Sequence, residues 1–186
     1  MDVLNLNNVT KTFGGFCAVN DLSFSIAAGS MYGLLGPNGA GKTTTIRMIM
    51  DIIVPDRGEI EILGKRGSSE IRDRVGYLPE ERGLYRKMKL GQLLLFFGQM
   101  KGLRKNETRG KIDYWLERFD LSDWKQKKVE ELSRGMQQKL QFITTIFHEP
   151  ELIILDEPFA GLDPLPSFNG NTSAESGRRA LSSAHS

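Results

Sequence analysis

The spacing of apolar and polar side chains predicts several short strands. Strands are predicted over residues 3–9 and 22–26, and in the second segment Phe24 and Ile26 alternate with Ser23 and Ser25. An apolar run over 31–35 stops at Gly36 and is typical of a buried strand. Three further segments carry strand signals, namely 59–63, 75–78 and 152–155.

Helical periodicity fills much of the remaining chain. Residues 42–52 repeat apolar side chains at helical spacing, and Pro55 begins the turn that follows. Helices are also predicted over 90–102, 106–118 and 134–147, with Gly102 and Pro150 as stop signals. This order indicates an α/β fold, a sheet core with a helical subdomain inserted at about residues 82–136.

Residues 165–186 break the pattern. They are rich in serine, contain no Val, Ile or Met, and show neither helical nor strand periodicity. We expect an irregular or disordered tail there, so that the domain is incomplete at its C-terminus.

Composition and charge remove several classes of protein. A formal charge of +2 over 186 residues is too small to indicate a nucleic-acid partner. The single cysteine cannot form an internal disulfide, and the longest apolar run, 93–97, is too short to span a membrane. No basic and apolar leader begins the chain, so we expect a cytoplasmic protein.

A phosphate-binding loop is the strongest chemical signal. Residues 36–43 fit the pattern G-x-x-x-x-G-K-[ST] in full, after an apolar strand and before a helix. The glycines allow backbone N–H groups to surround phosphate oxygens, and the helix start adds a positive dipole end. Lys42 would reach the β- and γ-phosphates, and the Thr43 hydroxyl would bind Mg²⁺.

Two further segments carry polar groups at the ends of elements. Asp156 and Glu157 follow the apolar strand 152–155, where Asp156 can hold Mg²⁺ and Glu157 can polarise an attacking water. An ordinary strand end meeting solvent is the alternative. Ser133 precedes a helix, where it suits either a helix N-cap or an anion site.

The order of these motifs carries a family resemblance. The phosphate loop, the helical insertion, Leu132-Ser133-Arg134-Gly135, the acidic strand end and Gly161-Leu162-Asp163-Pro164 follow one another. The chain thereby resembles the ATP-binding cassette (ABC) transporter ATPases over about residues 3–164. Segments 76–85 and 132–139 resemble the exporter-type subunits of sodium-efflux and drug-efflux systems. The implied fold is a P-loop NTPase core with a mixed β-sheet, as a nucleotide-binding domain over 1–164.

The resemblance implies roles for individual residues. The nucleotide would be held by Phe13, stacking on adenine, and by Gly36, Pro37, Asn38, Gly39, Ala40, Gly41, Lys42, Thr43 and Thr44. Mg²⁺ would be held by Thr43, Asp156 and Glu80, and catalysis would use Glu157, Lys42 and Glu80. Ser133 and Gly135 would contact ATP on the other subunit, and Asp163 would link the two sites.

Some of these assignments have alternatives or depart from the family pattern. Phe16 competes with Phe13, and Glu80 stands where the family usually has Gln. The apolar stripe over 90–100 predicts subdomain core, with a groove for a membrane partner as the alternative. The cations Arg82, Arg86, Lys87 and Lys89 predict a solvated face, with a contact to lipid headgroups as the alternative.

The implied function is that of an ATP-binding subunit. It would bind ATP and Mg²⁺, pair head to tail with a second ABC subunit, and drive export through a separate membrane permease. It would thus lie at the inner face of the cell membrane. The family also has a switch His beyond Asp163, and His185 lacks the strand that should precede it. A truncated, hydrolysis-deficient nucleotide-binding module is therefore the alternative, whereas a cassette acting on nucleic acid is disfavoured.

Overall fold

The computed structural model describes residues 1–66, 71, 73–80, 83–157 and 180–182. It divides into two compact units, one formed by Met1–Glu80 with Glu151–Ser186 and the other by Glu81–Pro150. The second unit extends past the expected end of the helical subdomain at residue 136 and includes the last described helix. Among the described residues, no helix is long and apolar enough to cross a membrane.

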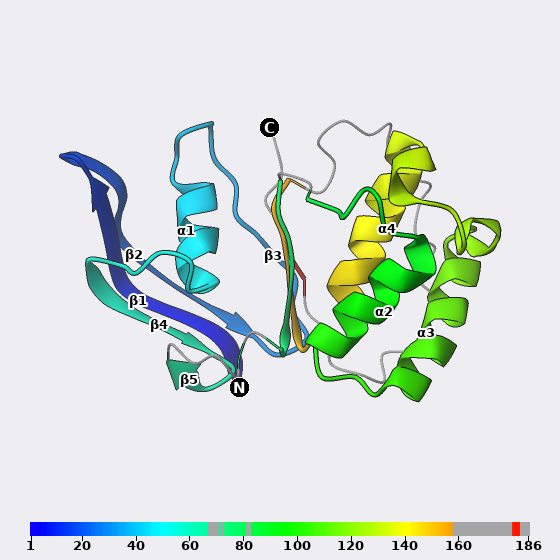
Figure 1. Ribbon diagram of the computed structural model, residues 1–186. Helices are drawn as coiled ribbons and strands as arrows, with labels where there is room; N and C mark the ends of the chain where they lie inside the picture. The colour runs from blue at the N-terminus through cyan, green and yellow to red at the C-terminus, as the bar shows by residue number, and fades with distance from the viewer. Residues whose placement is uncertain (67–70, 72, 81–82, 158–179, 183–186) are drawn as a thin grey trace. The chain divides into compact units, whose positions relative to one another are not determined.

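An antiparallel sheet forms one side of the first unit (Figure 1). Its strand order is β2-β1-β4-β5, with β1 at Asp2–Phe13, β2 at Phe16–Ala27, β4 at Arg57–Ile62 and β5 at Lys65–Arg66. Strands β1 and β2 run past the predicted 3–9 and 22–26 because their tips pair with each other as a hairpin, up to Phe13 opposite Phe16. The paired tips of a hairpin need no buried face. Their sequence therefore need not alternate apolar and polar residues, and the pattern does not predict them.

A parallel sheet forms the other side of this unit. Its order is β3-β8-β7-β6, with β3 at Tyr32–Gly33, β8 at Ala180–Ser182, β7 at Leu152–Leu155 and β6 at Val75–Leu78. Strand β3 is shorter than the predicted buried strand 31–35, and the residues at the two ends of that segment are not covered: Met31 and Leu35 are 82% and 68% exposed.

Strand β8 differs from the irregular tail expected over 165–186. Ala180–Ser182 pair in parallel with β7 on one side and with β3 on the other. The N–H and C=O groups along the facing edges of β3 and β7 need hydrogen-bond partners. Any extended segment can supply these partners through its backbone, whatever its side chains are. The remaining residues of 165–186 lie outside the described part of the chain.

Helix α1 (Lys42–Ile49) lies between the two sheets (Figure 1). Ile46, Met48 and Ile49 share one buried cluster with side chains of β1, β4, β6 and β7, among them Leu4, Leu6, Ile62, Val75 and Ile154. The helix ends before the predicted Ile52 because Asp51 adopts a left-handed conformation, with φ of 55°. The phosphate loop thus leads into a helix whose apolar face is buried.

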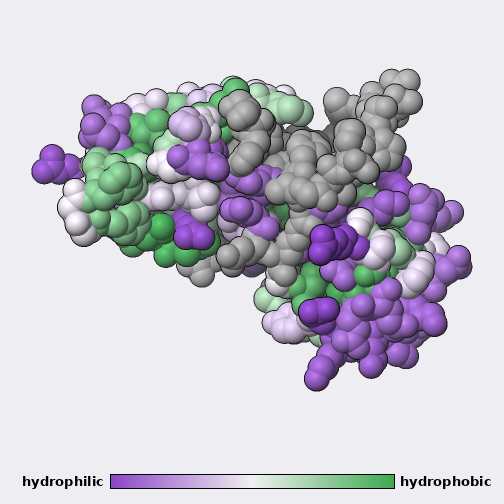
Figure 2. All heavy atoms as spheres, turned by 90° about the horizontal axis from the view of Figure 1, so that it is seen from above, coloured by the Kyte–Doolittle hydropathy of each residue, from purple (hydrophilic) through white to green (hydrophobic). Residues whose placement is uncertain are grey.

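The second unit is helical. It contains α2 (Leu90–Met100), α3 (Lys105–Arg118), the short 3-10 turns η2 (Ser122–Trp124) and η3 (Val129–Glu131), and α4 (Arg134–Ile146). Its core is apolar and well buried, including Leu93, Leu94, Trp115, Leu140 and Ile143. Hydrophilic side chains gather on one face of this unit, at the lower right of Figure 2.

Candidate functional site

The loop between β3 and α1 has the backbone of an anion cradle. Gly39 and Gly41 have φ of 83° and 84°, a region that L side chains rarely adopt. The N–H of Ala40 donates to the carbonyl of Pro37 at 3.1 Å, which closes the turn. Helix α1 begins directly afterwards, and its first turn contains no acidic residue. The free N–H groups and the positive end of the helix therefore face the same loop.

Lys42 lies over this loop. Its side chain is only 8% exposed, and its Nζ donates to the carbonyl oxygens of Gly36 and Pro37, the latter at 3.1 Å. A buried ammonium group needs such partners because water does not solvate it. These carbonyls hold the ammonium group beside the cradle. There it can donate to a phosphate oxygen in their place.

Gly41 joins the loop to the β1–β2 hairpin. A Cβ at this position would lie 2.2 Å from the carbonyl oxygen of Ala18 and 3.0 Å from Val19. The loop and strand β2 therefore touch through backbone atoms, which only glycine permits. This contact places the hairpin tip next to the phosphate cradle.

A cavity of about 470 Å³ opens at this junction. Predicted residues from four parts of the sequence line it, namely Phe13, residues 38–44, Glu80 and Glu157. Phe16 and Ala18 of the hairpin also line it. The cavity thus combines aromatic side chains, a cationic loop and two carboxylates, as a nucleotide with a metal ion requires.

The acidic strand end is fixed by pairing between β6 and β7. Leu78 lies opposite Leu155, and the N–H of Asp156 donates to the carbonyl of Leu78 at 2.9 Å. Asp156 is only 2% exposed. Burial of Tyr77 raises its pKa, and the negative charge of Asp156 raises it further. The carboxylate of Asp156 therefore lies close enough to Tyr77 to disfavour ionisation of its hydroxyl group.

Glu157 has an unusual backbone conformation. Its φ is 48°, in the left-handed region that costs a non-glycine residue energy. Glu157 lines the cavity, whereas its neighbour Asp156 stays buried. Two neighbouring carboxylates thereby have different environments, which suits different chemical tasks.

The donor set fits Mg²⁺ bound together with a nucleotide. Among the described residues no group of three or more His, Cys, Asp and Glu side chains could hold a metal ion alone. Mg²⁺ commonly uses one or two carboxylates with substrate phosphates and water, so such a cluster is not needed. Thr43, Glu80 and Asp156 are oxygen donors of the required kind, and Thr43 and Glu80 line the cavity.

The predicted signature residues lie in the second unit. Ser133 is the N-cap of α4, and its hydroxyl accepts a hydrogen bond from the N–H of Met136 at 3.3 Å. Ser133 and Gly135 are both exposed, with open space around Gly135. Asp163 and His185 lie outside the described residues.

The stripe on α2 divides between core and surface. Leu93 and Leu94 are fully buried, as the core interpretation predicts. Phe96 and Met100 are 37% and 60% exposed, and Phe96 packs edge-on against Tyr85 with ring centroids 5.5 Å apart. Arg86, Lys87 and Lys89 are exposed nearby in sequence, whereas Arg82 lies outside the described residues.

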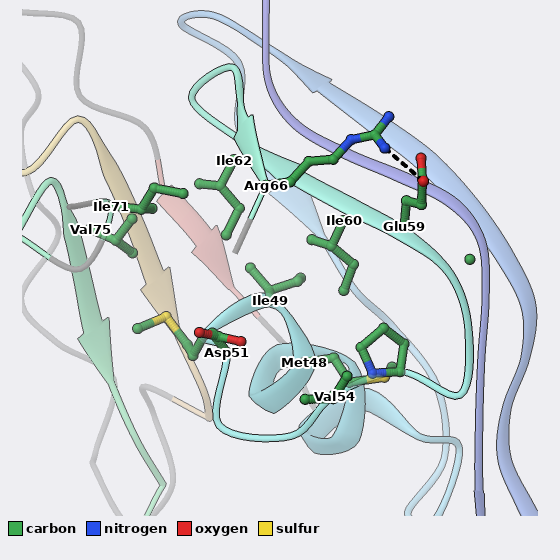
Figure 3. A pocket seen from close by; sticks show the side chains of 13 residues that line it. Met48, Ile49, Asp51, Val54, Glu59, Ile60, Ile62, Arg66, Ile71 and Val75 are labelled. Carbon is green, nitrogen blue, oxygen red and sulfur yellow. Dashed lines mark ion pairs between the residues drawn. The ribbon is translucent and has the colours of Figure 1, made fainter. Parts of the chain in front are cut away.

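A separate apolar cavity of about 230 Å³ lies beside the C-terminal end of α1. Figure 3 shows side chains from α1, β4 and the start of β6 around it, with the ion pair of Arg66 and Glu59 at its edge. None of its lining residues lines the cavity at the phosphate loop. It belongs to the apolar packing of the unit rather than to the nucleotide chemistry.

The sequence did not indicate every residue at the junction. Ala18 carries no chemical signal, because its contribution is a backbone oxygen. Lys11 and Asp56 had no predicted role, yet the Nζ of Lys11 lies over the ring of Phe13 and 2.7 Å from Asp56. Only the turn signal at 55–58 marked this region, and it did not reveal what the turn contacts.

Comparisons with known proteins agree with this geometry. A family model described as ABC transporter matches residues 19–160. The chain is 51% identical over 163 residues to the ABC transporter ATP-binding protein YhaQ of Bacillus subtilis, covering 88% of this chain and 55% of YhaQ. It is 37% identical over 166 residues to the probable multidrug ABC transporter ATP-binding protein YbhF of Escherichia coli, covering 88% of this chain and 29% of YbhF.

A solved structure shows the same fold. It is an ATP-binding subunit of an ABC transporter, 30% identical, with a TM-score of 0.83 over 97% of this chain and 79% of that one. The chain spans about half the length of YhaQ. From its phosphate loop, its fold and these relatives, the chain belongs to the ABC transporter family as one of its ATP-binding proteins.

Proposed function

We propose that this chain binds MgATP at the phosphate-loop cavity and hydrolyses it as the ATP-binding subunit of an export system. The observation that supports this most directly is the shared lining of one cavity by the loop with Lys42, by Glu80 and by Glu157. Relatives named for Nod factor export and for daunorubicin resistance support export as the direction of transport.

Each residue then has a defined task. The N–H groups of the loop and the ammonium of Lys42 bind the phosphates and offset their negative charge. Phe13 stacks on adenine, and Glu157 accepts a proton from the attacking water. Thr43, Asp156 and Glu80 would hold Mg²⁺, which would supply positive charge to the phosphate oxygens. The buried Asp156 and the accessible Glu157 keep metal binding apart from proton transfer.

The partner surfaces follow from exposed features of the second unit. Ser133 and Gly135, exposed at the start of α4, would contact the ATP of a second ABC subunit in a head-to-tail dimer. The exposed apolar side chains Tyr85, Phe96 and Met100 would receive a segment of a separate membrane permease. The chain would then lie at the cytoplasmic face of the membrane.

Titration calorimetry with MgATP, followed by turnover measurements, tests this function. We expect the unaltered chain to bind MgATP and to release phosphate faster than Glu157→Gln, because the amide cannot accept the proton. Glu59→Gln, a change at an exposed strand residue outside the cavity, is the matched control and should retain turnover.

The outcomes separate the candidate functions. Absence of MgATP binding would refute nucleotide binding altogether. Binding with equal background rates in the unaltered chain and in Glu157→Gln would instead support a hydrolysis-deficient nucleotide-binding module.

A further inference from the structure

Asp56 makes a network of hydrogen bonds at the end of strand β1. Its carboxylate Oδ2 accepts from the N–H of Thr12 at 2.7 Å, and its Oδ1 lies 2.7 Å from the Nζ of Lys11. Its own N–H donates to the carbonyl of Thr10 at 2.8 Å. Asp56 therefore contacts three successive residues directly before Phe13.

The network begins where the β1–β4 ladder stops. The last paired residues of that ladder are Thr10 and Arg57. Beyond them no described strand pairs with β1 on that side, so without Asp56 the N–H of Thr12 would have no acceptor among the described strands. The side chain of Asp56 supplies the acceptor that a longer β4 would have supplied, and it extends the order of β1 towards its tip.

Gly58 allows the turn to come this close. A Cβ at Gly58 would lie 2.3 Å from the carbonyl oxygen of Asn8 and 2.4 Å from that of Asn7. Its φ of 80° is also one that favours glycine. The turn that carries Asp56 is therefore pressed against β1 by backbone contact, and the position of Asp56 is set by the fold.

Lys11 connects this network to the aromatic ring. Its Nζ lies over the ring of Phe13, 5.4 Å from the centroid, and its side chain is only 14% exposed. An ammonium over a ring face is attracted to it. The ion pair with Asp56 fixes Lys11 on the ring, while Phe13 also lines the nucleotide cavity.

We propose that Asp56 is a positioning residue for base binding, which holds Lys11 and the backbone of Thr12 so that the Phe13 ring is presented to the adenine of ATP. The proposal rests on the proposed function, since it requires Phe13 to stack on the base. Asp56 does not line the cavity, so its influence on the nucleotide passes through Phe13.

The test compares a ligand that has a base with one that has none. Dissociation constants for ATP and for inorganic tripolyphosphate are measured by calorimetry on the unaltered chain and on Asp56→Ala, Asp56→Asn and Lys11→Met. We expect Asp56→Ala to weaken ATP binding by about tenfold, since both the ion pair and the Thr12 hydrogen bond are lost. Asp56→Asn and Lys11→Met should weaken it by roughly two- to fivefold, because the first removes the ion pair that holds Lys11 over the ring and the second removes the ammonium itself. Tripolyphosphate affinity should stay unchanged in all three.

A matched control comes from the same hairpin. Asp21 accepts a hydrogen bond from the side chain of Asn8 at 2.7 Å, and Asp21→Asn removes one exposed charge away from Phe13. This variant should bind both ligands as the unaltered chain does. If Asp56→Ala fails to fold, the isosteric Asp56→Asn decides the question.

Three results would overturn the proposal. Unchanged ATP affinity in Asp56→Asn and Lys11→Met would remove Asp56 from base binding while leaving nucleotide binding intact. Equal weakening of ATP and tripolyphosphate would show a general effect on the fold or the phosphate loop. Failure of the unaltered chain to bind either ligand would refute the proposed function together with this role.

Discussion

A Cβ at Gly41 would lie 2.2 Å from the carbonyl oxygen of Ala18. This relationship connects the phosphate loop to the strand whose hairpin carries Phe13 and Phe16. The loop that would hold the phosphates and the hairpin that would hold the base are therefore in direct backbone contact. Changes at Gly41 should disturb both parts together.

Gly41→Ala should reduce both stability and nucleotide binding. At Gly39, which has φ of 83° and open space around it, alanine meets only backbone strain, about 1 kcal/mol. At Gly41 the collision with Ala18 adds to that strain, so the loss of unfolding free energy should be larger, by about 1 kcal/mol or more. Urea unfolding and ATP titration of the two variants check this. Equal losses in the two variants would show that the contact with Ala18 has no influence.

Lys42→Met should weaken ATP binding while leaving the chain folded. The substitution keeps an apolar stem of similar size and removes the ammonium that donates to Gly36 and Pro37. Hydrogen bonds to charged groups contribute about 1.5–3 kcal/mol, so affinity should fall roughly ten- to hundredfold. Lys105→Met, at an exposed position of α3, is the control in the same calorimetric titration. An unaltered ATP affinity in Lys42→Met would contradict phosphate binding by this loop.

Substitutions of Ser133 separate helix capping from nucleotide contact. Ser133→Ala should lower the unfolding free energy by about 1 kcal/mol, because the N–H of Met136 loses its acceptor. Ser133→Asp keeps an acceptor and should restore stability, but it adds negative charge where a partner's phosphate would approach. We expect both variants to lose ATP turnover. Normal turnover in Ser133→Asp would leave Ser133 with a capping role only.

The carboxyl group of Asp56 should titrate at unusually low pH. Hydrogen bonds from Lys11 and then from the backbone of Thr12 hold the pKa of Asp56 below 3.8. A lowered folded-state pKa means that the stabilisation is present above pH 3.8 and is lost as pH falls through the folded-state value. NMR titration of the Asp56 side-chain carbon should therefore give a midpoint below 3.8, moving up towards that value in Lys11→Met. An identical midpoint in both proteins would show that the pair is not formed in solution.

Much of the fold follows from local patterns. The helices α2, α3 and α4 begin and end close to the positions that periodicity and stop signals predict. The pattern was less informative at β3, where an apolar run gave only a two-residue strand with Met31 and Leu35 exposed. An apolar run records a preference for burial, and whether another element covers it is a tertiary matter.

Local sequence is enough to predict the chemistry of the phosphate loop, because the spacing of Gly36, Gly41 and Lys42 is a property of nearby residues in the chain. It also placed Asp156 and Glu157 at the end of an apolar strand. Three other features emerge only when the chain is folded: Asp156 is buried while Glu157 lines the cavity, Ala18 touches Gly41, and Asp56 reaches Thr12 and Lys11. The physical reason is that such contacts join residues far apart in the chain, and their partners depend on strand register and on turns, not on residue type.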